Sequence, residues 1–189
     1  MQEYGRILLP VPNKLAVIIL NWRIINMDFK DQPFIPMLFG GDINTYSVAR
    51  AFYEEYQVKT YVFGKFPSGP SYNSNIIEYH ADLKIDTDDV FMKTVRDFAA
   101  AHADKTVLTI GCGDSYVALC SRHKDEMPEN VVAPYIDFEL MDRLQQKELF
   151  YRLCREHDND FPDTLGFRYG MDLDFELTFF FPVILKPSH

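Results

Sequence analysis

The stretch that decides the fold is Phe34-Ile-Pro-Met-Leu-Phe-Gly-Gly-Asp-Ile-Asn44, in which a short apolar run leads into paired glycines and then into polar residues. The apolar run predicts a buried strand. Just behind it, Val48, Phe52 and Tyr56 recur at a spacing of four residues, which predicts a helix with one apolar face. A strand, a glycine turn and an amphipathic helix in this order are typical of an α/β sheet.

The same alternation continues along the chain, with further apolar strands predicted at 59–63, 76–79, 106–110 and 131–136. Turn-forming residues predict a loop at 67–75, and helices are expected at 90–99, 116–124 and 138–157. We therefore predict an α/β fold, a Rossmann-like parallel sheet flanked by helices. We assign residues 34–137 to this domain and residues 138–189 to the start of a second one. Residues 1–33 show neither the helical nor the strand periodicity of apolar residues, and we assign them to an amino-terminal extension.

Composition excludes several classes of protein. The net charge of -9 argues against a nucleic-acid surface and against an anionic membrane, since both need a basic surface. The apolar run from Leu15 to Leu20 is far too short to span a bilayer. Glu3 and the lack of a small-residue cleavage site argue against a secretory signal, so we expect a cytoplasmic protein. We expect neither a disulfide nor a zinc site from the three cysteines Cys112, Cys120 and Cys154.

Two glycine loops, Gly40–Asn44 and Gly111–Ser115, follow predicted parallel strands. Ligands bind at this carboxyl edge of open α/β sheets. Glycines let a ligand come close to the backbone, and the helix that follows aims its N–H groups at an anion. The alternative is that both loops are ordinary strand-to-helix turns in which Asp42 and Ser115 cap helices.

The run Val107-Leu-Thr-Ile-Gly-Cys-Gly-Asp-Ser115 resembles the glycine loop of S-adenosylmethionine-dependent methyltransferases. The match is partial, because Ser115 stands where that family has its last glycine. In that family the loop also follows the first strand of the sheet, whereas here two or three strands come earlier. A methyltransferase-like cofactor binder is therefore an alternative function.

A lysine ends the apolar run Phe181-Pro-Val-Ile-Leu-Lys186, which predicts a buried strand. A buried lysine is costly unless it is paired with an anion. Taken alone, the end of this run at Lys186 favours an edge lysine that emerges into solvent. The sequence upstream reverses this preference.

With the helix that carries Lys147 and the turn Phe161-Pro-Asp-Thr164, this strand resembles the entry to the nucleotide-binding core of the ATP-grasp superfamily. The resemblance implies that Lys147 and Lys186 contact the ATP phosphates. Two ammonium groups would neutralise phosphate charge during phosphoryl transfer. The alternative for Lys147 is a solvated residue on a helix.

Over residues 34–188 the chain looks like the bacterial carboxylate-amine ligase branch of that superfamily, which includes the D-aspartate ligases of peptidoglycan cross-bridge synthesis. The resemblance implies small-molecule carboxylate and amine substrates, ATP and magnesium, and an amide formed through an acylphosphate. It also implies that the two glycine loops border the carboxylate or acceptor site, with Asp42, Asn44, Gly113 and Asp114. The oligomeric state stays open, a homo-oligomer included.

Members of this family continue well past the strand at Lys186, with the nucleotide lid and the magnesium-binding residues. We therefore expect this chain to be a truncated amino-terminal fragment that is inactive alone, with the magnesium ligands beyond its end. A third class, a stand-alone Rossmann-like binding module without catalysis, also fits the residues.

Overall fold

The computed structural model describes residues 28–167, 170–171 and 181–185. The elements in chain order are β1 (Phe34–Phe39), α2 (Ile43–Tyr56), β2 (Thr60–Gly64), α3 (Gly69–Tyr72), β3 (Ile77–Ala81), α4 (Asp88–Ala101), β4 (Thr106–Gly111), α5 (Asp114–Arg122), the 3-10 turn η1 (Lys124–Glu126), β5 (Val131–Val132), α6 (Phe138–Gln145) and α7 (Lys147–Glu156).

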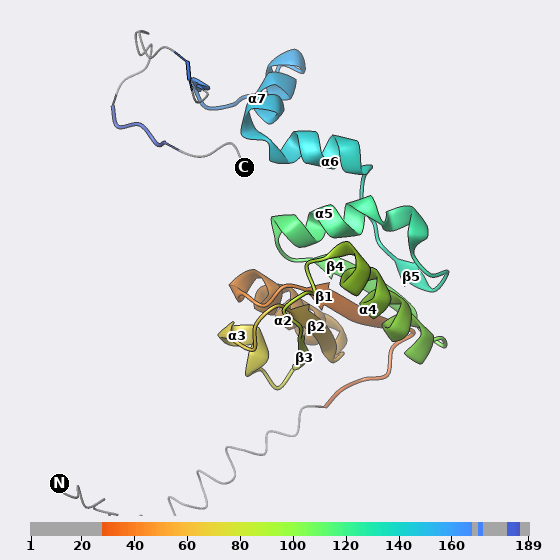
Figure 1. The fold of residues 1–189 in the computed structure, drawn as a ribbon. Helices are drawn as coiled ribbons and strands as arrows, with labels where there is room; N and C mark the ends of the chain where they lie inside the picture. Colours follow the sequence, from red (N-terminus) through yellow and green to blue (C-terminus); the bar gives the residue numbers. More distant parts are fainter. Residues whose placement is uncertain (1–27, 168–169, 172–180, 186–189) are drawn as a thin grey trace, which may run out of the picture.

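The five strands form one parallel sheet in the order β3-β2-β1-β4-β5. Helix α2 packs against one face, and α4 and α5 pack against the other (Figure 1). The short helix α3 lies beside α2 and β3. The predicted α/β fold with a Rossmann-like parallel sheet is confirmed, and α3 is an addition inside the stretch predicted as a loop.

Successive side chains of β1 point to opposite faces of the sheet, so β1 contributes to the core on both faces. Met37 and Phe39 point toward α4 and α5, whereas Leu38 points toward α2, and all three are fully buried. On the first face the rings of Phe39 and Phe91 lie 4.6 Å apart. A strand buried on both faces reads as an unbroken apolar run, which is the pattern that β1 carries in the sequence.

Strand β5 is much shorter than the predicted strand at 131–136. Its pairing with β4 stops at Val132, and Pro134 has no N–H to continue a ladder. The hydroxyl of Tyr135 instead accepts the Gly111 N–H at 2.7 Å. A side chain therefore replaces the missing strand partner at the end of β4.

The single helix predicted at 138–157 is two helices, because Gln146 adopts extended backbone angles of φ -79° and ψ 110°. Gln145, just before the break, donates its side-chain N–H to the backbone oxygen of Asp114 at 3.1 Å. No proline or glycine marks the break, and the apolar periodicity continues through it. The sequence therefore predicts one helix here. Lys147 becomes the first residue of α7.

The strand predicted at Phe181–Leu185 is wrong. These residues have no regular structure, and Ile184 and Leu185 are 81% and 79% exposed. A strand needs a neighbour for its N–H and C=O groups, and none of the described strands pairs with this segment. Lys186 lies outside the described residues.

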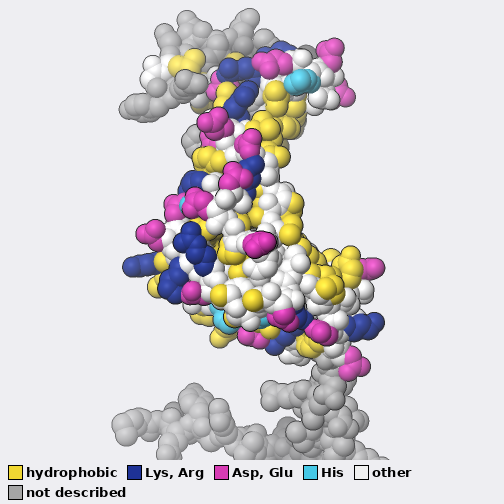
Figure 2. Space-filling model, turned by 90° about the vertical axis from the view of Figure 1, so that its right-hand side faces the viewer, with side chains coloured by type: hydrophobic (Ala, Val, Ile, Leu, Met, Phe, Trp, Pro, Cys, Tyr) yellow, Lys and Arg dark blue, Asp and Glu magenta, His cyan; other side chains and the backbone are white. Residues whose placement is uncertain are grey.

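Helices α6 and α7 extend beyond α5, away from the sheet (Figure 1). Hydrophobic side chains gather over this upper part of the molecule (Figure 2), and Leu140 and Phe150 are among the exposed ones. No described helix has the length and apolarity that crossing a membrane requires. The predicted domain boundary falls at Asp137, the residue that precedes α6, and it stays a prediction.

Candidate functional site

A cleft of about 430 Å³ opens at the carboxyl edge of the sheet. It lies where the chain direction splits, because β1 is followed by a helix on one face and β4 by a helix on the other. This switch point is where open α/β sheets bind ligands. Its lining comes from three loops and two tyrosines: Gly40, Gly41, Asp42, Lys65, Phe66, Ser68, Gly69, Tyr79, Cys112, Gly113, Ser115 and Tyr116.

The first wall follows β1 and centres on Asp42, the N-cap of α2. Its Oδ1 accepts the backbone N–H groups of Asn44 and Thr45, both at 3.0 Å, and the Thr45 hydroxyl at 3.1 Å. Its Oδ2 accepts the Asn44 side-chain amide at 3.0 Å. Burial alone would raise the pKa of Asp42, but these hydrogen bonds from Thr45 and Asn44 together lower it. Asp42 is thus an ionised helix cap.

We expect Asp42→Ala to lower the free energy of unfolding by about 1 kcal/mol at pH 7, because α2 loses its cap. Asp42→Asn should retain most of the stability, since asparagine caps equally well. The folded pKa is lowered, so the carboxylate's contribution is present above the unfolded pKa of about 3.9 and is lost as the pH falls through the folded value. Urea unfolding between pH 7 and pH 3 tests this, and a gap between wild type and Asp42→Ala that widens in acid would contradict it.

The second wall follows β4 and runs into α5. Gly113 is the N-cap of α5 and supplies no side-chain cap, while its carbonyl accepts the N–H groups of Tyr116 and Val117. The helix therefore presents its first N–H groups at the cleft without a capping side chain, an arrangement that favours an anion. Ser115 is the second residue of α5 and not its cap.

Gly111 lets α5 approach the end of β4 closely. A Cβ at this position would lie 2.6 Å from both the carbonyl carbon of Tyr116 and the N of Val117. Both are backbone atoms, so the first turn of α5 would have to move. The glycine is required by packing and not by an unusual φ.

We expect Gly111→Ala to lower the free energy of unfolding by about 1–3 kcal/mol, the usual cost of overpacking. The matched control is Gly113→Ala, whose Cβ would meet nothing closer than 3.9 Å. Urea unfolding monitored by circular dichroism measures both. Equal losses in the two variants would contradict the close contact between Gly111 and the first turn of α5.

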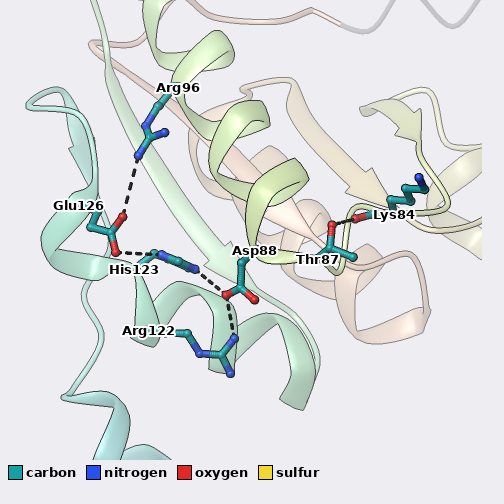
Figure 3. A network of polar contacts seen from close by, with 7 residues as sticks. All are labelled: Lys84, Thr87, Asp88, Arg96, Arg122, His123 and Glu126. Atoms are coloured by element: carbon teal, nitrogen blue, oxygen red, sulfur yellow. Dashed lines mark hydrogen bonds and ion pairs between the residues drawn. The ribbon is translucent and has the colours of Figure 1, made fainter.

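The second wall is also fixed from behind by a polar network that joins α4 to the end of α5 (Figure 3). Oδ1 of Asp88 accepts the Arg122 Nη1–H at 2.8 Å and lies 2.6 Å from Nε2 of His123. The other ring nitrogen of His123 lies 3.1 Å from Glu126 Oε1. The hydrogen bonds from Arg122 and His123 lower the pKa of Asp88, which therefore stays ionised.

The third wall follows β2 and completes the cleft. Lys65 forms an ion pair with Asp86 at 2.6 Å, and the Tyr79 hydroxyl donates to the Phe66 carbonyl at 2.8 Å. Gly69, with φ +80°, lies so close to the Gly41 carbonyl that a Cβ would approach it to 2.8 Å. The turn chemistry of 67–75 predicts only a loop, although the place of this loop after a parallel strand puts it at the same edge.

The protonation states of the titratable side chains in the cleft suit ligand binding better than nucleophilic attack. Burial raises the pKa of the Cys112 thiol to about 11, and of Tyr116 to about 12. Burial also raises the pKa of Tyr79. These groups are neutral at physiological pH, so the charges of the cleft come from the Asp42 carboxylate and the Lys65 ammonium. The cleft suits a small polar molecule, and an anionic group of that molecule would be accepted by the uncapped N–H groups at the start of α5.

The structure brings together two of the predicted substrate residues, Asp42 and Gly113, in one cleft. Asn44 and Asp114 are their chain neighbours but do not line it. The alternative role of Asp42 as a helix cap is confirmed, and that of Ser115 is wrong, because Gly113 caps α5. Lys147 lies on α7 and is not part of the cleft either. The ligand roles of all these residues stay predictions.

Two further observations concern cofactors. Within the described ranges, no group of three or more His, Cys, Asp or Glu side chains is placed to hold a metal ion, and the three cysteines are free thiols. The loop Gly111–Ser115 follows β4, the fourth strand along the chain. The methyltransferase resemblance places such a loop after the first strand instead.

The sheet order defines a Rossmann-like α/β domain with a cleft at the carboxyl edge of the sheet. Over 167 residues the sequence is 38% identical to the D-aspartate ligase of Enterococcus faecium, an alignment that takes in 85% of this chain and 40% of that protein. The chain therefore spans less than half the length of this curated relative, with which it is homologous over most of its own residues. No protein-family model matches the sequence, and no solved structure matches it.

Proposed function

We propose that this chain is the amino-terminal part of an ATP-dependent carboxylate-amine ligase whose edge cleft holds one of the two small-molecule substrates. The observation that carries the proposal is the 38% identity to a D-aspartate ligase over 85% of the chain. The substrate class proposed from this relative is a small amino acid such as D-aspartate, and the proposed role is peptidoglycan cross-bridge synthesis.

The cleft supports this role by the kind of ligand it suits. An amino acid carries a carboxylate, which the first turn of α5 can accept through its backbone N–H groups. The ammonium of Lys65, which is paired with Asp86, lies in the lining of the same cleft. The hydroxyls of Ser68 and Ser115 also belong to this lining and can orient an ammonium or a second carboxylate.

In the proposed reaction a carboxylate oxygen attacks the γ-phosphorus of ATP, ADP leaves, and the acylphosphate is then attacked by an amine that displaces phosphate to give the amide. Lys147 fits a phosphate contact, because it is half-buried at the first position of a helix, where the backbone also favours anions. Among the described residues, no group of three or more acidic, His or Cys side chains is placed to hold magnesium. What remains for the cleft is to bind and orient the amino acid.

Trapping the activated carboxylate tests this proposal. The protein as its gene encodes it is incubated with magnesium-ATP, D-aspartate and hydroxylamine, which converts an acylphosphate into a stable hydroxamate. We expect hydroxamate and ADP in equal amounts, with none in the absence of ATP and less with L-aspartate. Absence of ADP and hydroxamate with D-aspartate and with a panel of small D- and L-amino acids would overturn the proposed function.

A further inference from the structure

Strand β3 is the outermost strand on one side of the sheet. The Thr60 N–H donates to the Ile76 carbonyl and the Asp82 N–H to the Gly64 carbonyl. In a parallel ladder, alternate residues face the neighbour, so Glu78 and His80 turn their backbone toward β2. The backbone groups of Ile77, Tyr79 and Ala81 therefore point away from the sheet. No other strand of the described chain pairs with this edge.

This edge lacks three features that commonly keep strands from pairing with another chain. Its five residues, Ile77 to Ala81, include neither proline nor lysine, and their register with β2 is continuous, without a bulge. The Ile77 N–H is already satisfied by the Ser74 carbonyl at 3.3 Å. The N–H and C=O groups of Tyr79 and Ala81 are left to form the centre of a pairing surface.

The side chains of β3 are complementary to a second copy of the same strand. In an antiparallel pair centred on Tyr79, the two Tyr79 residues exchange backbone hydrogen bonds. Glu78 of each copy then lies directly opposite His80 of the other, at the positions where side chains come closest. Each imidazole can donate to the facing carboxylate, so the match forms twice by symmetry. The side chains of Glu78 and His80 are 43% and 47% exposed and accessible to such a partner.

A groove of about 400 Å³ borders the same edge, between β2, β3 and α4. Its wall includes an aromatic stack, in which the ring of His80 lies 4.9 Å from that of Phe63 at an interplanar angle of 15°. Phe98 of α4 closes the far side, 5.6 Å from Phe63. Pairing across β3 would place the grooves of two copies side by side and extend the contact beyond the strands, as a stable interface requires.

We propose that β3 is the interface of a two-fold symmetric homodimer, in which two five-stranded sheets join through antiparallel β3 strands. The occupant of this edge is a second copy of the chain because the Glu78 and His80 pattern complements itself. Glu78 already contacts Lys59 at 3.1 Å and its own His80 at 3.5 Å, so the carboxylate is held on the groove side of the sheet. The inference is independent of the proposed function.

A charge-swap series tests the interface by sedimentation velocity over a range of protein concentrations. E78H and H80E should each weaken dimerisation by about tenfold or more, because both replace two attractive cross-strand pairs with like pairs. The double variant E78H/H80E restores unlike pairs and should return the dissociation constant to within about threefold of wild type. The control D125H makes a comparable change of an acid to histidine at an exposed site in η1 and should leave dimerisation unchanged.

Hydrogen exchange gives a readout that does not depend on substitution. The amides of Tyr79 and Ala81 should exchange more slowly as protein concentration rises, whereas that of Val132, at the opposite edge of the sheet, should not change. A monomer at all concentrations overturns the proposal, as does a dimer unaffected by E78H and H80E. Protection of Tyr79 and Ala81 that is independent of concentration also overturns it, since another segment of the same chain would then cover the edge.

Discussion

Phe91→Ala is expected to lower the free energy of unfolding by about 3–5 kcal/mol, a large part of the stability of a domain of this size. Phe91 is fully buried, and its ring packs 4.6 Å from that of Phe39 and 6.1 Å from that of His123. Removing it leaves a cavity between α4 and the middle of the sheet. Because Asp88 and His123 lie nearby, we expect the junction of α4 and α5 to loosen as well.

The matched control is Phe66→Ala, the same truncation at a side chain that is 55% exposed. Its cost should stay below about 1 kcal/mol, because little apolar surface is returned to water. Urea unfolding followed by circular dichroism gives both values. A loss at Phe91 no larger than that at Phe66 would contradict the packing of α4 on the sheet.

Lys147→Ala and Lys186→Ala are each expected to lower kcat/KM for ATP by about a hundredfold or more in the ligase assay, a loss typical of removing one group that stabilises transition-state charge. This prediction rests on the proposed function. The resemblance assigns both ammonium groups to the phosphates, and Lys147 stands where the start of α7 also favours an anion. Steady-state kinetics with ATP varied at saturating amino acid measures the loss.

Lys84→Ala is the control for these variants, because Lys84 is an exposed lysine between β3 and α4. It should leave kcat/KM unchanged. Replacing Lys147 or Lys186 by arginine keeps the charge and should recover part of the activity. Unchanged ATP affinity and turnover in Lys186→Ala would show that this lysine is not part of the nucleotide site. The hydroxamate assay tests the proposed ligase function separately from this result.

The parts of the fold whose signal is local can be predicted from the sequence. An unbroken apolar run followed by paired glycines identifies β1, and a similar pattern identifies β4 and its loop. Because parallel strands end at the same edge, the order of strands and loops along the chain is enough to assign the two loops to one edge of the sheet. Asp42 and Gly113 do line one cleft.

The features that the sequence does not reveal depend on contacts between distant residues. The break at Gln146 carries no proline or glycine. Pro134 does mark the early end of β5 in the sequence, but the hydrogen bond from Gly111 to the Tyr135 hydroxyl has no local signal. Lys65 enters the cleft through the topology of the sheet, which periodicity alone does not show. The exposed segment Phe181–Leu185 illustrates that an apolar run becomes a strand only where a neighbouring strand pairs with it.

The four hydrogen bonds that the Asp42 carboxylate accepts have a consequence for engineering. Since this side chain caps α2, replacing it with a residue that cannot cap would alter stability and ligand preference together. Ser68 and Ser115 line the same cleft without serving as side-chain caps. A library built to change what the cleft accepts should therefore randomise these two serines and keep Asp42 constant.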